Sequence, residues 1–502
     1  MIARHRRLVP AVIGAVLLTL GACETVDPAS GGSGGGLFMS PAQEAKIGAE
    51  EHPKVLAQFG GVYDDPELGA YVAAIGGRLV AHSEKAGAPF TFTVLNSPIV
   101  NAFALPGGYV YVTRGLIALA NSEAELASVL AHEIGHVTAR HTARRYSRAT
   151  MAGLGSLILG AVTGNSMVQE LAKVGSELYL AGFSRQQESQ ADRLGVRYLT
   201  GTGYDPFAEA DFLATLARYS ALEAKVTGAG GGGGGFFATH PSTPKRVREA
   251  IAVAAGAGAR PYARPRHRDR FLDMIDGITY GDDPRDGVVD GRRFVHPTLG
   301  FTFTVPPGFQ MANTDEAVIA KGPGPSYIVF DAARVSPRVS MQRYLSAEWG
   351  AKAGLTGVEP LTVNGMEAAT GVTRTAGQGG RFDIRYIAIR FSGARVYRFR
   401  IVTPVARTAA LAEAMRRMTY SFRRLRPDEA PSAAPRIRIV TVKPGDTVET
   451  LASRMAVSKY PRETFLVLNA LAPGQPLKPG QKVKLVSRNG PRRGAASRRH
   501  PD

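Results

Sequence analysis

Two histidines and a glutamate in His132-Glu133-Ile134-Gly135-His136 are the residues of this sequence best suited to chemistry. Histidines four positions apart on an α-helix point the same way, so both imidazoles can reach one Zn²⁺ ion at about 2.0–2.1 Å. Glu133 lies beside them and can take a proton from a water molecule at the metal. The motif predicts a hydrolytic zinc site, and the alternative is a surface helix with two solvated histidines.

A third protein ligand is needed, because a catalytic zinc site holds three protein groups and leaves one position open. Glu188 and Asp192 supply carboxylates four residues apart, on one face of a later helix. Glu188 can bind the metal, while Asp192 orients a ligand histidine through its second ring nitrogen. Alone, this spacing is typical of a solvated helix face. Downstream of the HExxH motif, it favours a metal site.

These two motifs, followed by Thr239–Ser242 (Thr-His-Pro-Ser) and Arg246, resemble the gluzincin zinc metallopeptidases of the HtpX and CAAX-prenyl-protease family. The resemblance covers residues 40–256 and is nearest to the soluble periplasmic BepA-type proteases of outer-membrane protein quality control. Those proteases carry C-terminal helical repeats, which this sequence lacks. The resemblance implies a zinc endopeptidase with one Zn²⁺ per chain. It assigns His132, His136 and Glu188 to the metal, and Glu133, Asp192 and His240 to catalysis.

The resemblance implies that His240 lies on a loop over the active site and gates access to it. The glycines Gly230–Gly235 lie just before His240 in the sequence. They make such movement physically easy because glycine restricts the backbone least. The alternative is a histidine that is simply packed at the Pro241 turn.

The elements that must position these groups are predicted to be mostly helices. Apolar residues recur at three- and four-residue spacing in Pro53–Phe59, Leu68–Val80 and Glu123–Arg145. Phe90–Leu95 is typical of a strand, and Ala102–Val112 of a β-hairpin or small sheet around a glycine turn. The resemblance implies that Asn101–Ala104 is an edge strand along which an extended substrate pairs.

A chain of 502 residues is too long for one ordinary core, and its 44% hydrophobic and 21% charged residues suit soluble domains. We expect a multidomain protein with a mainly α zincin-type protease domain containing a small β-sheet, an α+β accessory domain and a small βααβ module. The predicted parts are a lipoprotein signal peptide (1–22), a flexible linker (23–39), the zinc metalloprotease domain (40–262), the accessory domain (270–425), a linker (426–436), the module (437–486) and a basic tail (487–502).

The module at 437–486 resembles a LysM domain. Its Pro444–Asp446 and Pro479–Gln481 turns flank a helix that ends near Leu468 and Asn469. The resemblance implies binding of N-acetylglucosamine-containing glycan, and hence peptidoglycan. The alternative is a small βααβ module with no glycan site.

The N-terminus is predicted to be an export signal. A basic start precedes the apolar run Leu8–Leu20, which is too short to span a bilayer comfortably. Leu20–Cys23 resembles a bacterial lipobox, which implies cleavage before Cys23, lipid on that residue and membrane attachment. The alternative is a free cysteine after a cytosolic apolar segment. Cys23 is the only cysteine, so neither an intramolecular disulfide nor a thiolate metal cluster can form.

Taken together, these features predict a periplasmic lipoprotein, and Glu24 after the cysteine favours the outer over the inner membrane. Its substrates would be misfolded or envelope proteins. The net charge of +19 alone does not choose among nucleic acid, anionic lipid and cell wall, and we expect no nucleic-acid partner. One alternative is a latent or non-catalytic scaffold linking outer membrane and peptidoglycan. Another is an enzyme that acts on peptidoglycan cross-links.

Overall fold

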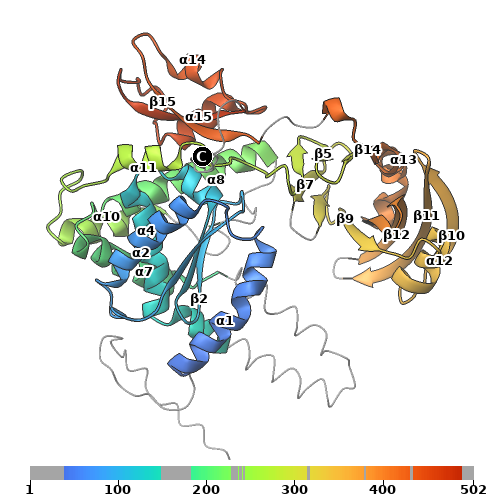
Figure 1. The fold of residues 1–502 in the computed structure, drawn as a ribbon, viewed down its shortest axis with the longest axis horizontal. Helices are drawn as coiled ribbons and strands as arrows, with labels where there is room; N and C mark the ends of the chain where they lie inside the picture. The colour runs from blue at the N-terminus through green and yellow to red at the C-terminus, as the bar shows by residue number, and fades with distance from the viewer. Residues whose placement is uncertain are drawn as a thin grey trace, which may run out of the picture. The chain divides into compact units, whose positions relative to one another are not determined.

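The computed structural model describes residues 39–147, 182–227, 236, 240, 244–313, 317–377, 380–429 and 434–488 (Figure 1). The predicted signal peptide, Cys23, nearly all of the 23–39 linker, Gly230–Gly235 and most of the basic tail lie outside these residues. Among the helices that are described, none combines the length and apolarity needed to cross a membrane.

The N-terminal lobe is mostly helical, as predicted. Its elements are α1 (Pro41–Gln58), α2 (Pro66–Val80), β1 (Thr91–Leu95), β2 (Ala102–Leu105), β3 (Tyr109–Thr113), α3 (Arg114–Leu119), α4 (Glu123–Thr138), α7 (Arg185–Gly201), α8 (Ala208–Thr227), α10 (Pro244–Gly256) and α11 (Arg268–Ile275). The sheet has the order β1-β3-β2, with β1 parallel and β2 antiparallel to β3. Gly107 and Gly108, at φ 82° and 84°, form the left-handed turn between β2 and β3. The strand β2 is therefore an edge strand.

The helix that carries the HExxH motif ends earlier than predicted. Helix α4 stops at Thr138, whereas apolar spacing predicted one helix to Arg145. Arg140 takes a left-handed conformation with φ 55°, where its side chain bonds to Glu44 and its guanidinium reaches the Met39 carbonyl. A single left-handed residue breaks an α-helix. The chain turns back there and brings His141 beside His136.

The strand-rich lobe follows. Its elements are β4 (Val288–Asp290), β5 (Arg293–His296), β6 (Phe301–Thr304), β7 (Gln310–Asn313), β8 (Val318–Lys321), β9 (Tyr327–Arg334), α12 (Met341–Arg343), the π-helix η1 (Tyr344–Trp349), β10 (Thr356–Val363), β11 (Met366–Gly377), β12 (Gly380–Ser392), β13 (Arg395–Pro404), α13 (Val405–Ser421), β14 (Arg423–Arg424) and the 3₁₀ turn η2 (Pro427–Glu429). Its seven-stranded sheet has the order β10-β11-β12-β13-β9-β8-β7. Helix α13 lies on one face, and α12 with η1 on the other.

The C-terminal module is built from β15 (Arg436–Thr441), α14 (Val448–Ala452), α15 (Pro461–Leu468) and β16 (Lys482–Ser487), with β15 antiparallel to β16. Its apolar residues, among them Phe465 and Leu485, belong to the same buried cluster as Leu130 and Ile134 of α4. The module and the N-terminal lobe therefore share one hydrophobic core.

Candidate metal centre

Helices α4 and α7 carry the predicted site, and glycines allow them to approach closely. Both begin at a serine cap, because Ser122 accepts from the Glu125 amide and Ser184 from the Gln187 amide. A Cβ at Gly135 would lie 3.1 Å from the Ala191 carbonyl oxygen, and backbone cannot easily move aside. The close packing holds the His132–His136 face of α4 against the Glu188–Asp192 face of α7.

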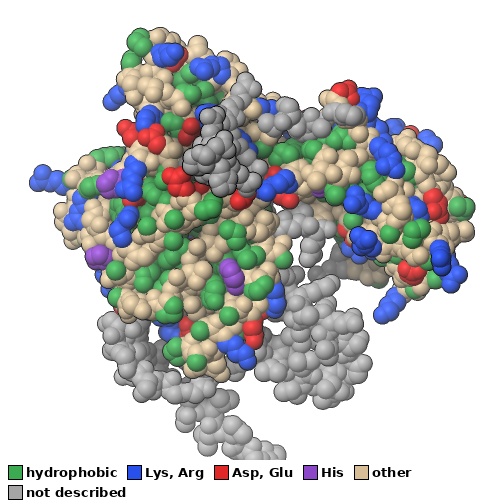
Figure 2. Space-filling model, in the orientation of Figure 1, with side chains coloured by type: hydrophobic (Ala, Val, Ile, Leu, Met, Phe, Trp, Pro, Cys, Tyr) green, Lys and Arg blue, Asp and Glu red, His purple; other side chains and the backbone are tan. Residues whose placement is uncertain are grey.

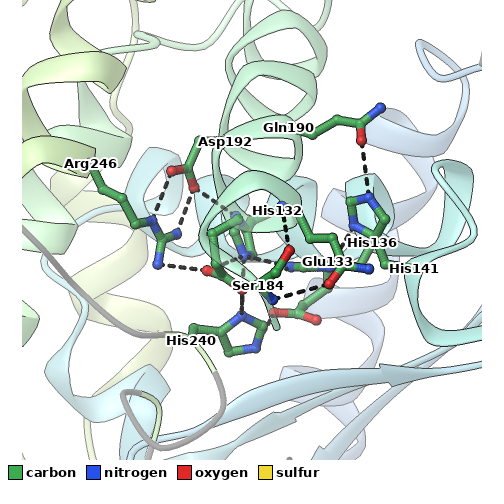
Figure 3. Close-up of polar contacts among 11 residues, drawn as sticks. His132, Glu133, His136, His141, Ser184, Gln190, Asp192, His240 and Arg246 are labelled. Atoms are coloured by element: carbon green, nitrogen blue, oxygen red, sulfur yellow. Dashed lines mark hydrogen bonds and ion pairs between the residues drawn. The ribbon is translucent and has the colours of Figure 1, made fainter. Parts of the chain in front are cut away.

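Four side chains converge on one point between these helices (Figure 3). His132 Nε2 lies 3.0 Å from His136 Nε2, and Glu188 has one oxygen 3.6 Å from His132 Nε2 and the other 3.5 Å from His136 Nε2. With His240, one ligand atom from each residue falls within 4.8 Å of the others. All four residues are buried, so this group of nitrogen and oxygen donors could hold one metal ion.

A second set of contacts orients the ligand side chains from the side away from the cluster. Asp192 Oδ1 lies 2.9 Å from His132 Nδ1, on the ring side away from the cluster. Arg246 of α10 donates to both oxygens of Asp192, at 2.6 and 2.8 Å, and its Nη1 lies 2.6 Å from Glu188 Oε2. One guanidinium thus bridges two buried carboxylates and orients both.

The electrostatics keep two of the ligand groups, His136 and Glu188, in forms that bind metal. Burial raises the pKa of Glu188 and of Asp192, but histidine and arginine neighbours outweigh it and leave both below their ordinary values. Burial and the charges of nearby histidines lower the pKa of His136 well below 6.5. His136 is therefore a neutral imidazole and Glu188 a carboxylate, the forms that coordinate a cation.

Glu133 provides a test of whether a metal and its water fit here. The side chain is fully buried, and neither oxygen has a hydrogen-bond partner within the described ranges, although His240 Nε2 lies 3.3 Å from Oε1. A buried carboxylate without donors is costly. A water held at the cluster would supply one. The imidazole and carboxylate donors also match the ligands of catalytic zinc, so the residues fit the group.

His240 reaches the cluster from a segment tied to the strand edge. Its amide donates to the Phe236 carbonyl at 2.7 Å, and the Phe236 amide donates to the Val100 carbonyl just before β2. The Phe236 and His240 rings stack with centroids 4.6 Å apart. His240 Nδ1 lies 3.1 Å from Glu188 Oε1 and 3.3 Å from His132 Nε2. The imidazole is thus part of the cluster, whereas a residue packed only at a turn would point elsewhere.

Several side chains around the site have no assigned role in the sequence motifs. Phe183 stacks on His136 at 3.8 Å between ring centroids, and the Arg145 guanidinium lies 4.0 Å above Phe183. His141 bonds to His136 Nδ1 and to Gln190, and burial lowers its pKa to about 4. His141 could be found only once the turn at Arg140 was known, because a continuous helix would place it on another face.

Glu209 of α8 is a further buried carboxyl beside the site. Its oxygens lie within 4.8 Å of donor atoms of Asp192 and His132. Burial, then the Asp192 charge, raise the pKa of Glu209 well above its ordinary value of 4.5. Nothing in the α8 sequence marks it, because a glutamate in the first turn of a helix is ordinary.

Replacing Glu209 with Gln should stabilise the metal-free protein at high pH. The unfolded chain releases this proton near pH 4.5 but the folded chain keeps it, so stability is full below that pH and falls as pH rises. Gln cannot ionise, so the variant does not lose stability in this way as the pH rises. We expect the chelator-treated variant to be more stable than the unsubstituted chain by on the order of 1 kcal/mol at pH 8, and by less at pH 5.

Urea unfolding at both pH values measures this difference, with the exposed Glu348→Gln as the matched control. Parallel stability curves for the Glu209→Gln variant and the unsubstituted chain would show that Glu209 is ionised in the folded protein.

Comparison with known proteins identifies two of the domains. Residues 66–254 match the model of peptidase family M48, and residues 440–486 match the LysM domain, which confirms both predicted resemblances. The coarse prediction of a helical peptidase region, a strand-rich region and a LysM module is also confirmed.

Several proteases are similar to this chain. The beta-barrel assembly-enhancing protease of Escherichia coli (strain K12) is 33% identical over 231 residues, covering 44% of this chain and 45% of that protein. The putative beta-barrel assembly-enhancing protease of Vibrio cholerae is 41% identical over 165 residues, 31% of this chain and 34% of the relative. The mitochondrial metalloendopeptidase OMA1 of Arabidopsis thaliana is 35% identical over 167 residues, 33% and 32% of the two chains. The chain spans less than half the length of each relative. It carries a domain of peptidase family M48 and, after the strand-rich lobe, a LysM domain.

Proposed function

We propose that this protein is a zinc-dependent endopeptidase of the bacterial cell envelope. The observation that carries the proposal is the convergence of His132, His136 and Glu188 around a buried Glu133 that has no hydrogen-bond donor of its own among the described residues. The family M48 domain and the protease names of its relatives support the same activity. One Zn²⁺ per chain is the metal that this donor set favours.

Each residue then has a defined task in peptide hydrolysis. Zinc, when bound, polarises the scissile carbonyl and makes water more acidic. His132, His136 and Glu188 hold the ion, while Asp192 and Arg246 keep the ligands oriented. The Glu133 carboxylate takes a proton from the attacking water and returns it to the nitrogen of the leaving amine.

An extended substrate would pair with the edge strand β2, as its place at the end of the sheet order allows. The Phe236 amide is bonded to Val100 at the start of this edge. The segment that carries His240 therefore lies where a substrate would enter, and its withdrawal would open both the edge and the metal.

The proposed location is the periplasm, on the outer membrane in preference to the inner membrane. Lipid on Cys23 would hold the chain at the membrane, and the LysM domain would bind peptidoglycan. Protein substrates would be misfolded or envelope proteins reached between these two attachments. The domain boundaries given above belong to this proposal.

The test is incubation of the purified protein with casein, with and without a zinc chelator. Cleavage that the chelator abolishes and added Zn²⁺ restores would support a zinc endopeptidase. Release of muropeptides from peptidoglycan without cleavage of casein would instead support an enzyme of cross-links. One bound zinc per chain with no cleavage of either would support a latent protein or a scaffold.

A latent resting state has a specific observation in its favour, because His240 lies within the ligand cluster. We expect His240→Ala to raise basal casein cleavage by about 3- to 10-fold, since removing one competing ligand of a metal is worth on the order of 1 kcal/mol. The exposed His82→Ala variant is the control and should leave the rate unchanged. A loss of activity as deep as that of a Glu133 variant would make His240 catalytic and contradict gating.

A further inference from the structure

The strand-rich lobe contains a cavity of about 760 Å³ between its sheet and α13. Strands β10 to β13 form the floor, and one side of α13 forms the wall. The volume falls inside the range of about 300–1,000 Å³ that is usual for small-molecule sites.

The cavity persists because α13 is tied at both ends. Near its start, the Thr408 hydroxyl donates to Asp383 Oδ2 at 2.8 Å on β12. Near its end, the Asn364 amide, from the turn between β10 and β11, donates to the Tyr420 carbonyl at 2.8 Å. Twisted sheets diverge from a straight helix laid across them. With both ends fixed, α13 packs on the floor through Leu411 and Met415 and leaves the cavity beside this contact.

The floor and wall are apolar at their centre. The apolar side chains that line the cavity are Leu361, Val372, Ile387, Ile401, Leu411 and Met415. Ile387 and Ile401 are already almost fully buried in the core, so the half-buried Leu361, Val372 and Leu411 supply the apolar surface open to a ligand. Such a surface suits a hydrocarbon chain, which gains about 0.8 kcal/mol for each methylene removed from water.

One cation rises from this apolar floor without a carboxylate partner. Arg385 stands opposite Val372 on β11 and opposite Ile401 on β13. Its Nη1 donates to the Thr370 hydroxyl at 3.1 Å, and no ion pair to Arg385 occurs in the described part of the lobe. The other two arginines of the lining, Arg374 and Arg416, are paired with Asp383 and Glu413, each at 2.7 Å. Arg385 is therefore the cation of the lining that is available to a ligand.

The surrounding lobe is basic as well. Residues 327–421 contain 14 Lys and Arg but only six Asp and Glu. Figure 2 shows the blue side chains spread over the part of the chain formed by β10–β13 and α13. This excess of positive charge attracts anions to the lobe, although the lining also holds the exposed carboxylate of Glu359 on β10.

We propose that this cavity binds an anionic single-chain amphiphile, with its acyl chain on the apolar floor and its carboxylate or phosphate head on Arg385. A neutral apolar ligand would leave the exposed Arg385 guanidinium without an anion, whereas an anionic head would gain charge-assisted hydrogen bonds from it. A cationic head would meet the guanidinium at close range. The strand-rich lobe thus becomes a lipid-sensing part of the protein, distinct from the metal centre and independent of the proposed peptidase activity.

Equilibrium dialysis of the full chain tests the proposal, with radiolabelled palmitate and lysophosphatidate as the two anionic probes and lysophosphatidylcholine as the zwitterionic one. All are used below their micelle-forming concentrations. Arg385→Ala removes the cation, and Ala412→Trp places a large side chain on the exposed wall of the cavity. Arg400→Ala is the matched control, because it removes one exposed arginine from the opposite face of the same sheet.

We expect one saturable site for at least one anionic probe, weakened about ten-fold or more by Arg385→Ala and lost in Ala412→Trp, with Arg400→Ala unchanged. Binding of palmitate alone would assign a fatty acid, and binding of lysophosphatidate alone a phosphate-headed lipid. No saturable site, equal binding of the zwitterionic lipid, or equal effects of Arg385→Ala and Arg400→Ala would overturn the proposal.

Discussion

The Glu133→Gln variant should bind one zinc ion per chain and lose peptide-bond cleavage by a factor of about 10²–10⁴, the usual contribution of a general base. Gln has the shape of Glu but cannot accept a proton from water. Glu133 lies outside the metal-ligand set of His132, His136 and Glu188, so the ligands stay in place. Casein cleavage and zinc content, measured on the same preparation, give the two numbers that the prediction needs.

The control separates loss of the base from loss of the metal. Glu188→Gln replaces a proposed ligand with a neutral amide, and should lower zinc content as well as activity. It also leaves Arg246 with one carboxylate partner fewer, so its melting temperature should fall. Glu133→Gln should change neither zinc content nor melting temperature. Cleavage by Glu133→Gln within ten-fold of the unsubstituted chain would show that another group moves the proton.

The structure brings the predicted residues together, and the sequence can indicate this because its signals are local. Residues four apart on one helix fix which side chains share a face, so the pairs in α4 and α7 follow from spacing alone. The groups behind them do not, because Arg246 belongs to the resemblance without an assigned role, and Glu209 comes from another helix with ordinary spacing. The turn at Arg140 was missed for a related reason. Its left-handed conformation accompanies contacts to Glu44 and Met39, about a hundred residues away.

The fold shows the same division between local and long-range information. Alternating or continuous apolar residues predict strands at Phe301–Val305, Tyr327–Phe330, Phe382–Ile389 and Val396–Val402, which are the regions of β6, β9, β12 and β13. This pattern could not give the sheet order, in which β13 pairs with β9 across α12, η1 and three intervening strands, β10 to β12. The sequence predicts a helical stretch over Met341–Lys352, and the structure divides it into the short α12 and the π-helix η1, which ends at Trp349. Packing of Trp349 against Tyr386 is a long-range contact that helical periodicity does not contain.

The least predictable feature is the role of Lys484 in the LysM domain. On an alternating strand, a lysine is expected to face solvent, but Lys484 is fully buried against the N-terminal lobe. Its ammonium donates to the carbonyls of Ala118, Leu119 and Ala120 at 2.9, 3.0 and 2.7 Å. Burial lowers its pKa well below 10.5, and the charge of Glu125 in α4 opposes this shift. Three carbonyls use all three ammonium donors at the end of α3.

Replacing Lys484 with Met should therefore destabilise the protein by about 3 kcal/mol, or about 6–12 °C in melting temperature. Met keeps the apolar stem in place, so the loss reports the three carbonyls left without a donor. The matched control is Lys482→Met, two residues earlier on the same strand. Lys482 pairs with Asp273 at 2.6 Å, but both side chains are partly exposed, and such pairs contribute about 0–1 kcal/mol.

The two lysine substitutions test whether the LysM domain and the peptidase domain unfold as one unit. A domain on a flexible tether would bind the wall while the peptidase moved freely, and removing it would leave peptidase stability unchanged. The buried cluster shared with α4 instead makes the two domains unfold together, in one calorimetric transition that Lys484→Met shifts as a whole. Equal effects of the two substitutions, or an unchanged melting temperature for a chain ending before Arg436, would contradict this. A single transition would mean that the LysM domain and α4 form one folding unit, so that any glycan bound by this domain would be held at a fixed orientation to the proposed metal site.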